Sequence, residues 1–290
     1  MLPSASKLRG ILSSSEPVIV PGAYDALTAS LVEEAGFAAV YATGAGISNS
    51  QLALADVGLL TMSEMLYQVR RMASAVSVPI ICDIDSGYGN AVNLFRTVDE
   101  FIRAGAAAVQ IEDQIVPKRC GHFEGKHLVP INEAVLKIRA AVEARGDSGL
   151  VIIGRTDAIA VEGFERAIER AEAYHEAGAD VLFVEAPRTE EEMAEIARRL
   201  PGPKVINLVE GGQTPILTHD QLREMGYAIV LYANLVLRTG IKAIQSNLHH
   251  LRQHGDTTAL TDRMISFEER ARLTRKEFVD DLEQRYVNAT

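Results

Sequence analysis

The sequence predicts a closed α/β barrel of eight parallel strands, a (β/α)8 barrel of the TIM type, and three observations support this fold class. Short β-branched and other apolar runs alternate with longer amphipathic segments along the chain, as in repeated βα units. Several amphipathic segments end in Ala-Gly just before the next run, at 35–36, 104–105 and 177–178, which is typical of a helix C-cap. The chain has 290 residues, and such barrels need about 250.

Each element can be placed from this pattern, because the strands of a parallel barrel are buried on both faces and read as nearly continuous apolar runs. We expect the strands, in order, at residues 18–20, 38–42, 79–83, 107–111, 150–153, 181–184, 204–208 and 228–232. We expect the helices at residues 26–35, 63–75, 92–104, 131–144, 163–177, 190–200, 220–225 and 235–254. An open doubly wound sheet is the alternative, but the first βα turn lacks the Gly-x-Gly-x-x-Gly phosphate loop.

The C-terminal residues 266–286 form a charged amphipathic stretch that follows a complete barrel. This stretch predicts one more helix, and the barrel has no further strand for it to cover. We therefore expect it to pack on a partner subunit. The predicted organisation is a catalytic barrel at residues 1–255 and a helical extension at residues 256–290.

Composition and charge exclude several classes of protein. The 29 Lys and Arg against 39 Asp and Glu give a net charge of −10, which gives no support to nucleic-acid binding. No apolar run approaches the roughly 18 residues of a membrane span, and the first residues lack the apolar core of a signal peptide. We expect a cytoplasmic protein without a membrane partner. Two cysteines are too few for a disulfide framework or a cysteine zinc site.

Polar residues follow six successive apolar runs, where the catalytic groups of barrel enzymes gather. They lie at 41–46, 83–90, 112–113, 155–157, 185 and 207. Asp83 and Asp85 alternate along one strand end, so both can face the barrel axis. With Glu112 and Glu185 they would repel one another unless a cation lies among them, and such oxygen ligands suit Mg²⁺ better than zinc. The alternative is that the two aspartates only cap the next helix.

Three other stretches carry candidate binding or catalytic groups. Residues 118–122, Lys-Arg-Cys-Gly-His, place a thiol beside cationic groups that lower its pKa, so Cys120 can donate a proton near neutral pH. The alternative is a basic surface loop with a stray cysteine. Residues 43–46, Thr-Gly-Ala-Gly, offer a hydroxyl and backbone N–H groups to an anion. Arg155 offers a bidentate clamp for a carboxylate, or a partner for neighbouring acids.

These stretches together resemble the isocitrate lyase and phosphoenolpyruvate mutase superfamily. Lys118 to His122 looks like its signature, and the blocks at 83–90, 111–114, 155–158 and 207–212 match its other blocks in order. The resemblance runs from about residue 21 to the C-terminus and is closest to the short members. It implies an α/β barrel that uses Mg²⁺, or Mn²⁺, and a homotetramer in which a C-terminal helix is exchanged between subunits. It also implies that the loop with Cys120 closes over the substrate.

The resemblance assigns roles to particular residues, and these are expectations for this chain. It implies catalytic roles for Tyr41, Lys118, Cys120, His122 and Arg155. Around the metal it implies Asp56, Asp83, Asp85 and Glu112. For the substrate it implies contacts from Thr43, Gly44, Ala45, Gly121, Arg155, Glu185 and Asn207.

The activity implied is Mg²⁺-dependent cleavage of a C–C bond in a small anionic 2-hydroxy di- or tricarboxylate, like 2-methylisocitrate or an alkylmalate. Tyr41, or a group that it positions, accepts the hydroxyl proton, an α-keto acid such as pyruvate leaves, and Cys120 protonates the enolate-like carboxylate fragment. Residues 232–235, Tyr-Ala-Asn-Leu, depart from the Tyr-Pro and nearby Ser of many of these lyases. Residues 210–215 are similar to a loop of the carboxyphosphonoenolpyruvate mutase branch. Phosphonate mutation or oxaloacetate turnover is the alternative, and a catalytically silent binding protein is another.

Overall fold

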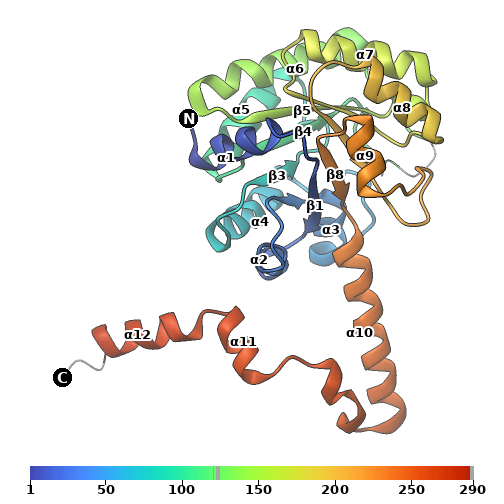
Figure 1. Cartoon of the computed structure of the whole chain (residues 1–290). Helices are drawn as coiled ribbons and strands as arrows, with labels where there is room; N and C mark the ends of the chain where they lie inside the picture. Colours follow the sequence, from blue (N-terminus) through green and yellow to red (C-terminus); the bar gives the residue numbers. More distant parts are fainter. Residues whose placement is uncertain (120, 122–124, 288–290) are drawn as a thin grey trace. The chain divides into compact units, whose positions relative to one another are not determined.

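The computed structural model describes residues 1–119, 121 and 125–287. Eight parallel strands close into a barrel, each pairing with the next along the chain and β8 pairing back to β1 (Figure 1). This confirms the predicted fold class. The strands are β1 Val18–Ala23, β2 Val40–Ala42, β3 Ile80–Asp83, β4 Ala108–Glu112, β5 Val151–Thr156, β6 Val181–Val184, β7 Lys204–Asn207 and β8 Ile229–Tyr232.

All eight predicted strands are present, and their bounds differ most at β1 and β5. β1 continues through Pro21 and Gly22 to Ala23, although Pro-Gly usually marks a turn. β5 continues through Arg155 and Thr156, whose polarity breaks the apolar run. In both strands pairing with a neighbouring strand continues through these residues.

The barrel helices also lie where the sequence predicts them, and several begin at a side chain that caps the first turn. Asp25, Thr61 and Thr218 each accept a hydrogen bond from the backbone three residues on and form capping boxes, which satisfies otherwise unpaired N–H groups. The helices are α2 Ala26–Glu34, α4 Met62–Ala75, α5 Ala91–Arg103, α6 Ile131–Arg145, α7 Phe164–Glu176, α8 Glu190–Arg199 and α9 His219–Met225.

Further helical segments lie outside the sequence prediction. After β2 the chain forms α3 Gly44–Ile47 and a π-helix at Ser48–Leu52, where the sequence predicts no helix. Three 3₁₀ segments lie at Gly146–Ser148, Ala158–Ala160 and Thr258–Arg263. The N-terminal residues form α1 Pro3–Leu12, with Pro at its first position, where the missing N–H does no harm.

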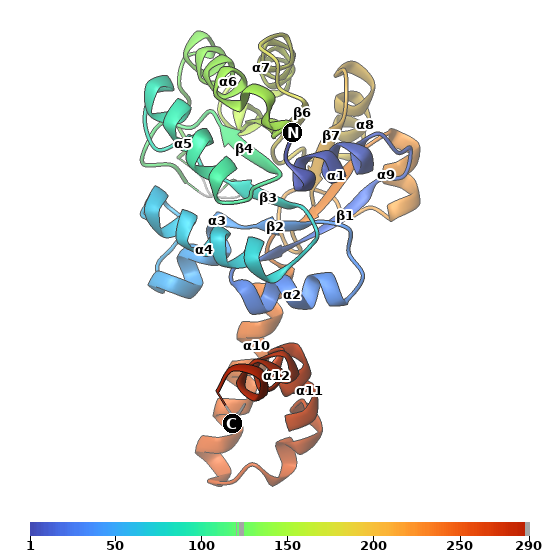
Figure 2. The same cartoon turned by 90° about the vertical axis from the view of Figure 1, so that its left-hand side faces the viewer.

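Helix α1 closes the end of the barrel at which the strands begin. Figure 2 shows it in front of the strands, with the outer helices around it. Its Leu8 is fully buried and packs in the same cluster as the interior residues Val20, Val151 and Val205. Arg9 donates to the carbonyls of Gly149 and Leu150 and pairs with Asp180. Apolar packing and these bonds therefore fix α1 on the barrel.

The alternation of side chains along each strand divides the barrel into two apolar regions and a polar end. One set of residues, such as Ile81, Ile153 and Phe183, fills the barrel interior, and the set between them, such as Cys82 and Ile152, packs under the outer helices. Two residues beyond an interior apolar residue, the same face carries a polar group. Asp83 follows Ile81 in this way, Arg155 follows Ile153, Glu185 follows Phe183 and Asn207 follows Val205, while in β4 the buried polar Gln110 takes the interior position before Glu112.

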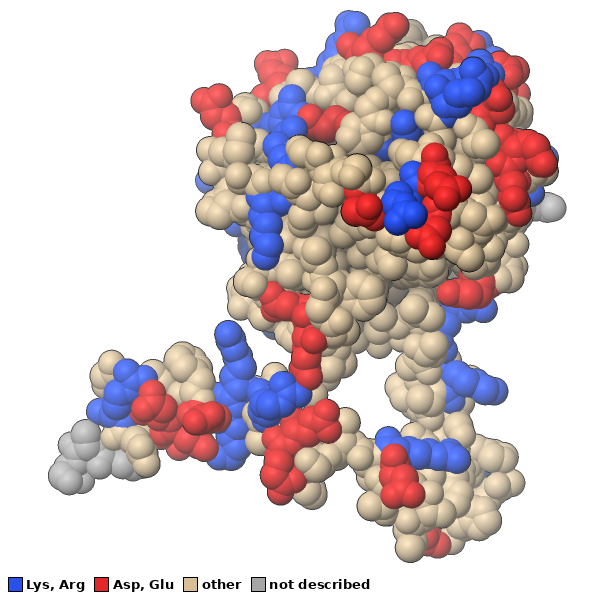
Figure 3. Space-filling view, in the orientation of Figure 1, with Lys and Arg blue, Asp and Glu red and all other residues tan. Residues whose placement is uncertain are grey.

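The chain divides into two compact units, Met1–Leu237 and Arg238–Thr290. The second contains most of α10 Leu235–His254, then α11 Phe267–Leu273 and α12 Lys276–Tyr286. The prediction of one helix over 266–286 was wrong, because Arg275 has φ 55°, in the left-handed region that ends a helix. None of the described helices is both long and apolar enough to cross a membrane. On the face of the barrel unit in Figure 3, acidic and basic side chains are interspersed.

Candidate active site

A cavity with a volume of about 40 Å³ lies at the end of the barrel where the strands finish. This is the end at which barrel enzymes carry their catalytic groups. Most of the predicted site residues line it, although they come from distant parts of the chain. The predicted residues in its wall are Tyr41, Thr43, Ala45, Asp56, Asp83, Lys118, Gly121, Arg155, Glu185 and Asn207.

The acids at the end of β3 are paired with a lysine. Lys118 Nζ lies 2.5 Å from Asp56 Oδ1 and 2.9 Å from Asp85 Oδ1, and only 4% of the lysine side chain is exposed. Burial lowers the pKa of Lys118, but Asp85, Glu112 and Asp56 raise it by more, so it stays charged. Burial raises the pKa of the Asp85 carboxyl, and Lys118 opposes that shift. A cation therefore already lies among the acids that the sequence assigns to a metal.

Asp83 is held by its own strand end and by the next strand. Its Oδ1 accepts a hydrogen bond from the Asp85 backbone N–H at 3.1 Å and from Gln110 Nε2 at 3.4 Å, and the β3–β4 register places Asp83 opposite Gln110. Asp85 has φ 48°, and Ala186, next to Glu185, has φ 57°. Residues other than Gly adopt this conformation at a cost that is commonly found at functional sites.

The guanidinium nitrogens of Arg155 lie close to three acids of the same chain, Asp157, Glu112 and Glu185. Nε and Nη2 donate to the two oxygens of Asp157 at 3.0 and 3.1 Å, a bidentate pair. Nε also lies 3.5 Å from Glu112 Oε2, and Nη1 lies 3.7 Å from Glu185 Oε2. Burial lowers the pKa of Arg155, but Asp157, Glu185 and Glu112 raise it by more. Nη1 is the part of the guanidinium directed toward Glu185 in the cavity wall.

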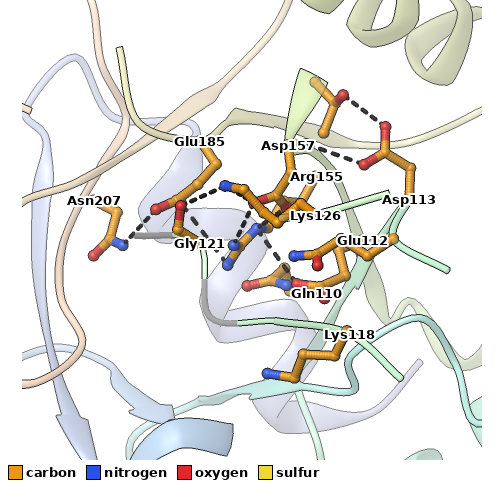
Figure 4. A network of polar contacts seen from close by, with 12 residues as sticks. Gln110, Glu112, Asp113, Lys118, Gly121, Lys126, Arg155, Asp157, Glu185 and Asn207 are labelled. Atoms are coloured by element: carbon orange, nitrogen blue, oxygen red, sulfur yellow. Dashed lines mark hydrogen bonds and ion pairs between the residues drawn. The ribbon is translucent and has the colours of Figure 1, made fainter. Parts of the chain in front are cut away.

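Glu185 and Asn207 form the side of the cavity at β6 and β7. Asn207 Nδ2 donates to Glu185 Oε1 at 3.4 Å, as Figure 4 shows. The carbonyl oxygen Oδ1 of Asn207 is buried and has no hydrogen-bond donor among residues 1–119, 121 and 125–287. A buried carbonyl without a donor is costly, so this atom is a natural contact for a bound hydroxyl or another donor.

Tyr41 lies at the base of the cavity and its hydroxyl donates to Gln110 Oε1. Burial, followed by the charge of Asp83, raises the pKa of Tyr41 well above its usual value. The phenol is therefore neutral and a poor proton acceptor. Of the two sequence alternatives for Tyr41, the geometry favours the one in which it positions another group, because Gln110 continues the chain of hydrogen bonds to Asp83.

Two glycines allow backbone to approach the charged groups closely. A Cβ at Gly44 would lie 3.0 Å from Asp83 Oδ2, and a Cβ at Gly121 would lie 2.5 Å from Arg155 Nη2 and 2.7 Å from Glu185 Oε1. Thr43 caps α3 by accepting a hydrogen bond from Gly46 N–H. Its hydroxyl is thus already bonded within the loop that the sequence assigns to a substrate carboxylate.

The predicted metal residues do not form a closed ligand set. No three Asp, Glu, His or Cys side chains of the described ranges converge as a metal site, since Asp56 binds Lys118 and Glu112 lies beside Arg155. The donors still suit a hard cation: Asp83 and Asp85 lie together, and Glu112 Oε1 is buried without a hydrogen-bond donor from the described residues. Mg²⁺ is commonly held by one or two carboxylates and several waters, which this arrangement allows.

Some site residues lie outside the prediction, and two predicted ones lie outside the described structure. Cys120 and His122 are not among the described residues. Lys126, Asp157 and Asp113 form a buried network next to the cavity (Figure 4), and Asn234 lines the cavity near β8. Gln110 could have been found as a polar residue inside an apolar strand. For Lys126 the sequence carries no such signal, because it lies in an irregular segment.

Known proteins resemble this chain along nearly its whole length. The family described as phosphoenolpyruvate phosphomutase matches residues 8–252. A 2,3-dimethylmalate lyase from Eubacterium barkeri is 43% identical, with 98% of each chain covered. A 2-methylisocitrate lyase from Aeropyrum pernix is 45% identical, covering 94% of this chain and 85% of the relative. An Arabidopsis thaliana carboxyvinyl-carboxyphosphonate phosphorylmutase, chloroplastic, is 43% identical, with 93% and 81% covered.

Solved structures agree with these relatives. The crystal structure of 2,3-dimethylmalate lyase, described as a PEP mutase/isocitrate lyase superfamily member, has a TM-score of 0.93 at 33% identity, with 99% and 96% of the two chains covered. Oxaloacetate acetylhydrolase with 3,3-difluorooxalacetate has a TM-score of 0.92 at 34% identity, with 97% and 96% covered. Phosphonopyruvate hydrolase with oxalate and Mg²⁺ has a TM-score of 0.89 at 34% identity, with 99% and 100% covered. The chain belongs to the phosphoenolpyruvate phosphomutase family, within the PEP mutase/isocitrate lyase superfamily.

Proposed function

We propose that the protein is a Mg²⁺-dependent lyase that cleaves a C–C bond of a 2-hydroxy di- or tricarboxylate, such as an alkylmalate or 2-methylisocitrate. The products are pyruvate or another α-keto acid and a carboxylate. The strongest support is that Asp83, Arg155, Glu185 and Asn207 line one cavity, and that Asp85 is hydrogen-bonded to Asp83 there. The 43% identity to a 2,3-dimethylmalate lyase over nearly full length supports the same reaction class.

Different residues of the cavity bind different parts of such a substrate. Arg155 Nη1, which is not used on Asp157, faces a substrate carboxylate, and Asn207 Oδ1 accepts from a substrate donor. Asp83 and Asp85 would hold the metal, and Glu112 would lie near it. Mg²⁺, when bound, supplies positive charge that stabilises the oxyanion developing on the substrate. The resting pairing of Lys118 with Asp85 would keep these acids in place before binding.

The reaction then requires one proton to leave oxygen and another to reach carbon. Loss of the substrate hydroxyl proton makes that carbon a carbonyl as the C–C bond breaks, and the electron pair passes to the other fragment. We assign the first transfer to a group positioned by the Tyr41 and Gln110 hydrogen bonds, because the buried phenol itself stays protonated. We assign the second to Cys120, whose neighbours Lys118 and His122 in the sequence favour an acidic thiol.

A second candidate is chemistry at a P–C bond or hydrolysis of oxaloacetate. Identity to the Arabidopsis phosphorylmutase is also 43%, and oxaloacetate acetylhydrolase shares the fold closely. The β8 end, with Ala233 and Asn234 in the cavity wall, departs from the lyase pattern and is where the substrate classes would be distinguished.

A substrate screen with metal control tests the proposal. We expect 2,3-dimethylmalate or 2-methylisocitrate to release an α-keto acid with Mg²⁺, all turnover to stop in excess chelator, and added Mg²⁺ to restore it. Asp83→Asn should abolish this turnover, and the exposed Asp147→Asn is the matched control. Phosphonopyruvate or oxaloacetate as the preferred substrate would replace the lyase assignment with the second candidate. Full activity in chelator would overturn the metal dependence.

A further inference from the structure

Lys126 is a buried lysine whose partners both belong to the active site. Its side chain is 2% exposed, and its Nζ donates to the Gly121 carbonyl and to Asp157 Oδ1, the latter at 3.0 Å (Figure 4). Burying an ammonium costs several kcal/mol unless it is well paired. Among residues 1–119, 121 and 125–287, these two contacts are the ones that compensate the Lys126 ammonium.

The first partner, Gly121, lies directly against the two charged side chains of the cavity wall. A Cβ at this position would meet Arg155 Nη2 at 2.5 Å and Glu185 Oε1 at 2.7 Å, so only a bare backbone fits. The Lys126 ammonium holds the carbonyl of this residue. The placement of the Gly121 backbone at the cavity therefore depends on Lys126.

The second partner, Asp157, is the carboxylate that orients Arg155. It is fully buried, and its oxygens bind Lys126 Nζ and the Nε and Nη2 atoms of Arg155. The Asp157 N–H donates to Asp113 Oδ1 at 3.0 Å, so this carboxylate is anchored to β4 and β5. Asp157 pairs with two cations, Lys126 and Arg155. Its single negative charge therefore does not fully neutralise Arg155.

We infer that Lys126 is a positioning residue for the reaction, one that ties the Gly121 backbone through Asp157 to the Arg155 guanidinium. Its own side chain does not line the cavity, so it acts on the reaction only through these two groups. This inference rests on the proposed lyase function, because Gly121 and Arg155 are assigned to substrate there. Lys126 thereby holds the Gly121 backbone next to Arg155 and Glu185, at the ends of β5 and β6.

The test compares Lys126→Met with Lys204→Met. Lys204 is also a buried lysine, but it donates to the carbonyls of Ala197 and Leu200 at the end of α8, away from the cavity. Both changes remove a buried ammonium of the same length. With 2,3-dimethylmalate and Mg²⁺, we expect Lys126→Met to lower kcat by about 10- to 100-fold, since small misplacements cost about that much. KM should stay within about threefold, and Lys204→Met should leave both constants near wild type.

Hydrogen exchange provides a readout that needs no substrate. In Lys126→Met, exchange in the peptide covering residues 117–128 should rise at least about tenfold, while peptides of β5 and α8 stay unchanged. Lys126→Arg restores a donor at the same place and should recover part of both kcat and protection. Equal kcat and equal exchange in the two Met variants would overturn the inference. A protein without lyase activity whose exchange still responds to Lys126→Met would instead overturn the proposed function alone.

Discussion

Each buried cation of the site lies among acids, and these pairs determine where the charged side chains stand. Lys118 lies between Asp56 and Asp85, and Arg155 lies among Asp157, Glu112 and Glu185. Desolvation would otherwise make such a concentration of acids unstable. The sequence predicts Arg155 and most of these acids because they follow apolar strands, whereas Lys118 and Asp56 are expected from the 118–122 stretch and the family resemblance. It does not predict which acid binds which cation, since the pairing depends on distances across neighbouring strands.

Gly121→Ala tests the close approach of backbone to Arg155. The added Cβ would lie 2.5 Å from Nη2, so either the guanidinium or the backbone must shift. Misplacement of a substrate-binding group lowers turnover by about 10²-fold, and we expect kcat/KM to fall by about that factor. Gly10→Ala, in α1 with no atom within 4 Å of its Cβ, is the control and should remain fully active. An active Gly121→Ala protein would show that this contact is not needed.

Cys120→Ser tests the proton donor predicted from the sequence. A hydroxyl is far less acidic than a tuned thiol, and general acid catalysis is worth about 10²–10⁴-fold, so turnover of the lyase substrate should fall by about that factor. Binding of a pyruvate or succinate analogue, measured by calorimetry, should survive because Arg155 and Asn207 remain. Cys82, whose thiol pKa is raised by burial, offers the control Cys82→Ala, which should retain turnover.

Two outcomes would count against this role of Cys120. Cleavage within a few-fold of wild type would show that the thiol is not the donor. A large loss of affinity for the pyruvate or succinate analogue in Cys120→Ser would show that the substitution disturbs binding and not proton transfer. A phosphonate mutase would be affected much less by the same substitution, so the result also bears on the choice between the two reaction classes.

At the scale of elements, the strands position the site and α1 supports it from the opposite end of the barrel. The period of two along β3 to β7 turns the same face of each strand from apolar in the interior to polar at the cavity. This is why a simple pattern of apolar runs predicts both the core and the site. Helix α1 has no such pattern, and the sequence does not predict it, because only Ala5 and Leu8 of its residues are buried.

Leu8→Ala tests the contribution of α1 to stability. Leu8 is fully buried among the interior residues of the barrel, and removing a buried leucine side chain costs about 2–5 kcal/mol through lost burial and a cavity. We expect a loss of that size in urea unfolding at constant denaturant slope. Leu27→Ala, at a position of α2 that is 50% exposed, should change stability by less than about 0.5 kcal/mol. Equal effects would mean that α1 does not pack as described.

At the scale of the whole molecule, the C-terminal unit exposes apolar side chains that a folded chain normally buries. Phe267 of α11 and Phe278 of α12 are 75% and 58% exposed, Ile265 just before α11 is 54% exposed, and neither helix has a buried residue. Contiguous exposed apolar surface marks an interaction site. This agrees with the sequence prediction that residues 256–290 pack on another subunit of a homotetramer, which stays a prediction here.

Deletion of residues 256–290 tests that assembly. If the segment buries its apolar face across a subunit boundary, light scattering should show a smaller species for the shortened chain than for the full one. The double substitution Phe267→Ser with Phe278→Ser should weaken assembly in the same direction, and the exposed Glu283→Gln should not. The prediction would be contradicted if the full-length protein is a monomer. It would also be contradicted if the shortened chain forms an assembly with the same number of subunits as the full-length chain.

The sequence by itself determined the barrel, the order of its strands and the set of strand-end residues at the site, because burial on both faces and a period of two leave a direct mark on the order of residues. Only the tertiary structure decided that Lys118 pairs with Asp56 and Asp85, that Tyr41 donates to Gln110, that Lys126 holds Gly121, and that the C-terminal segment breaks at Arg275. These features depend on distances between segments far apart in the chain or on one backbone angle, and neither leaves a periodic signal in the sequence.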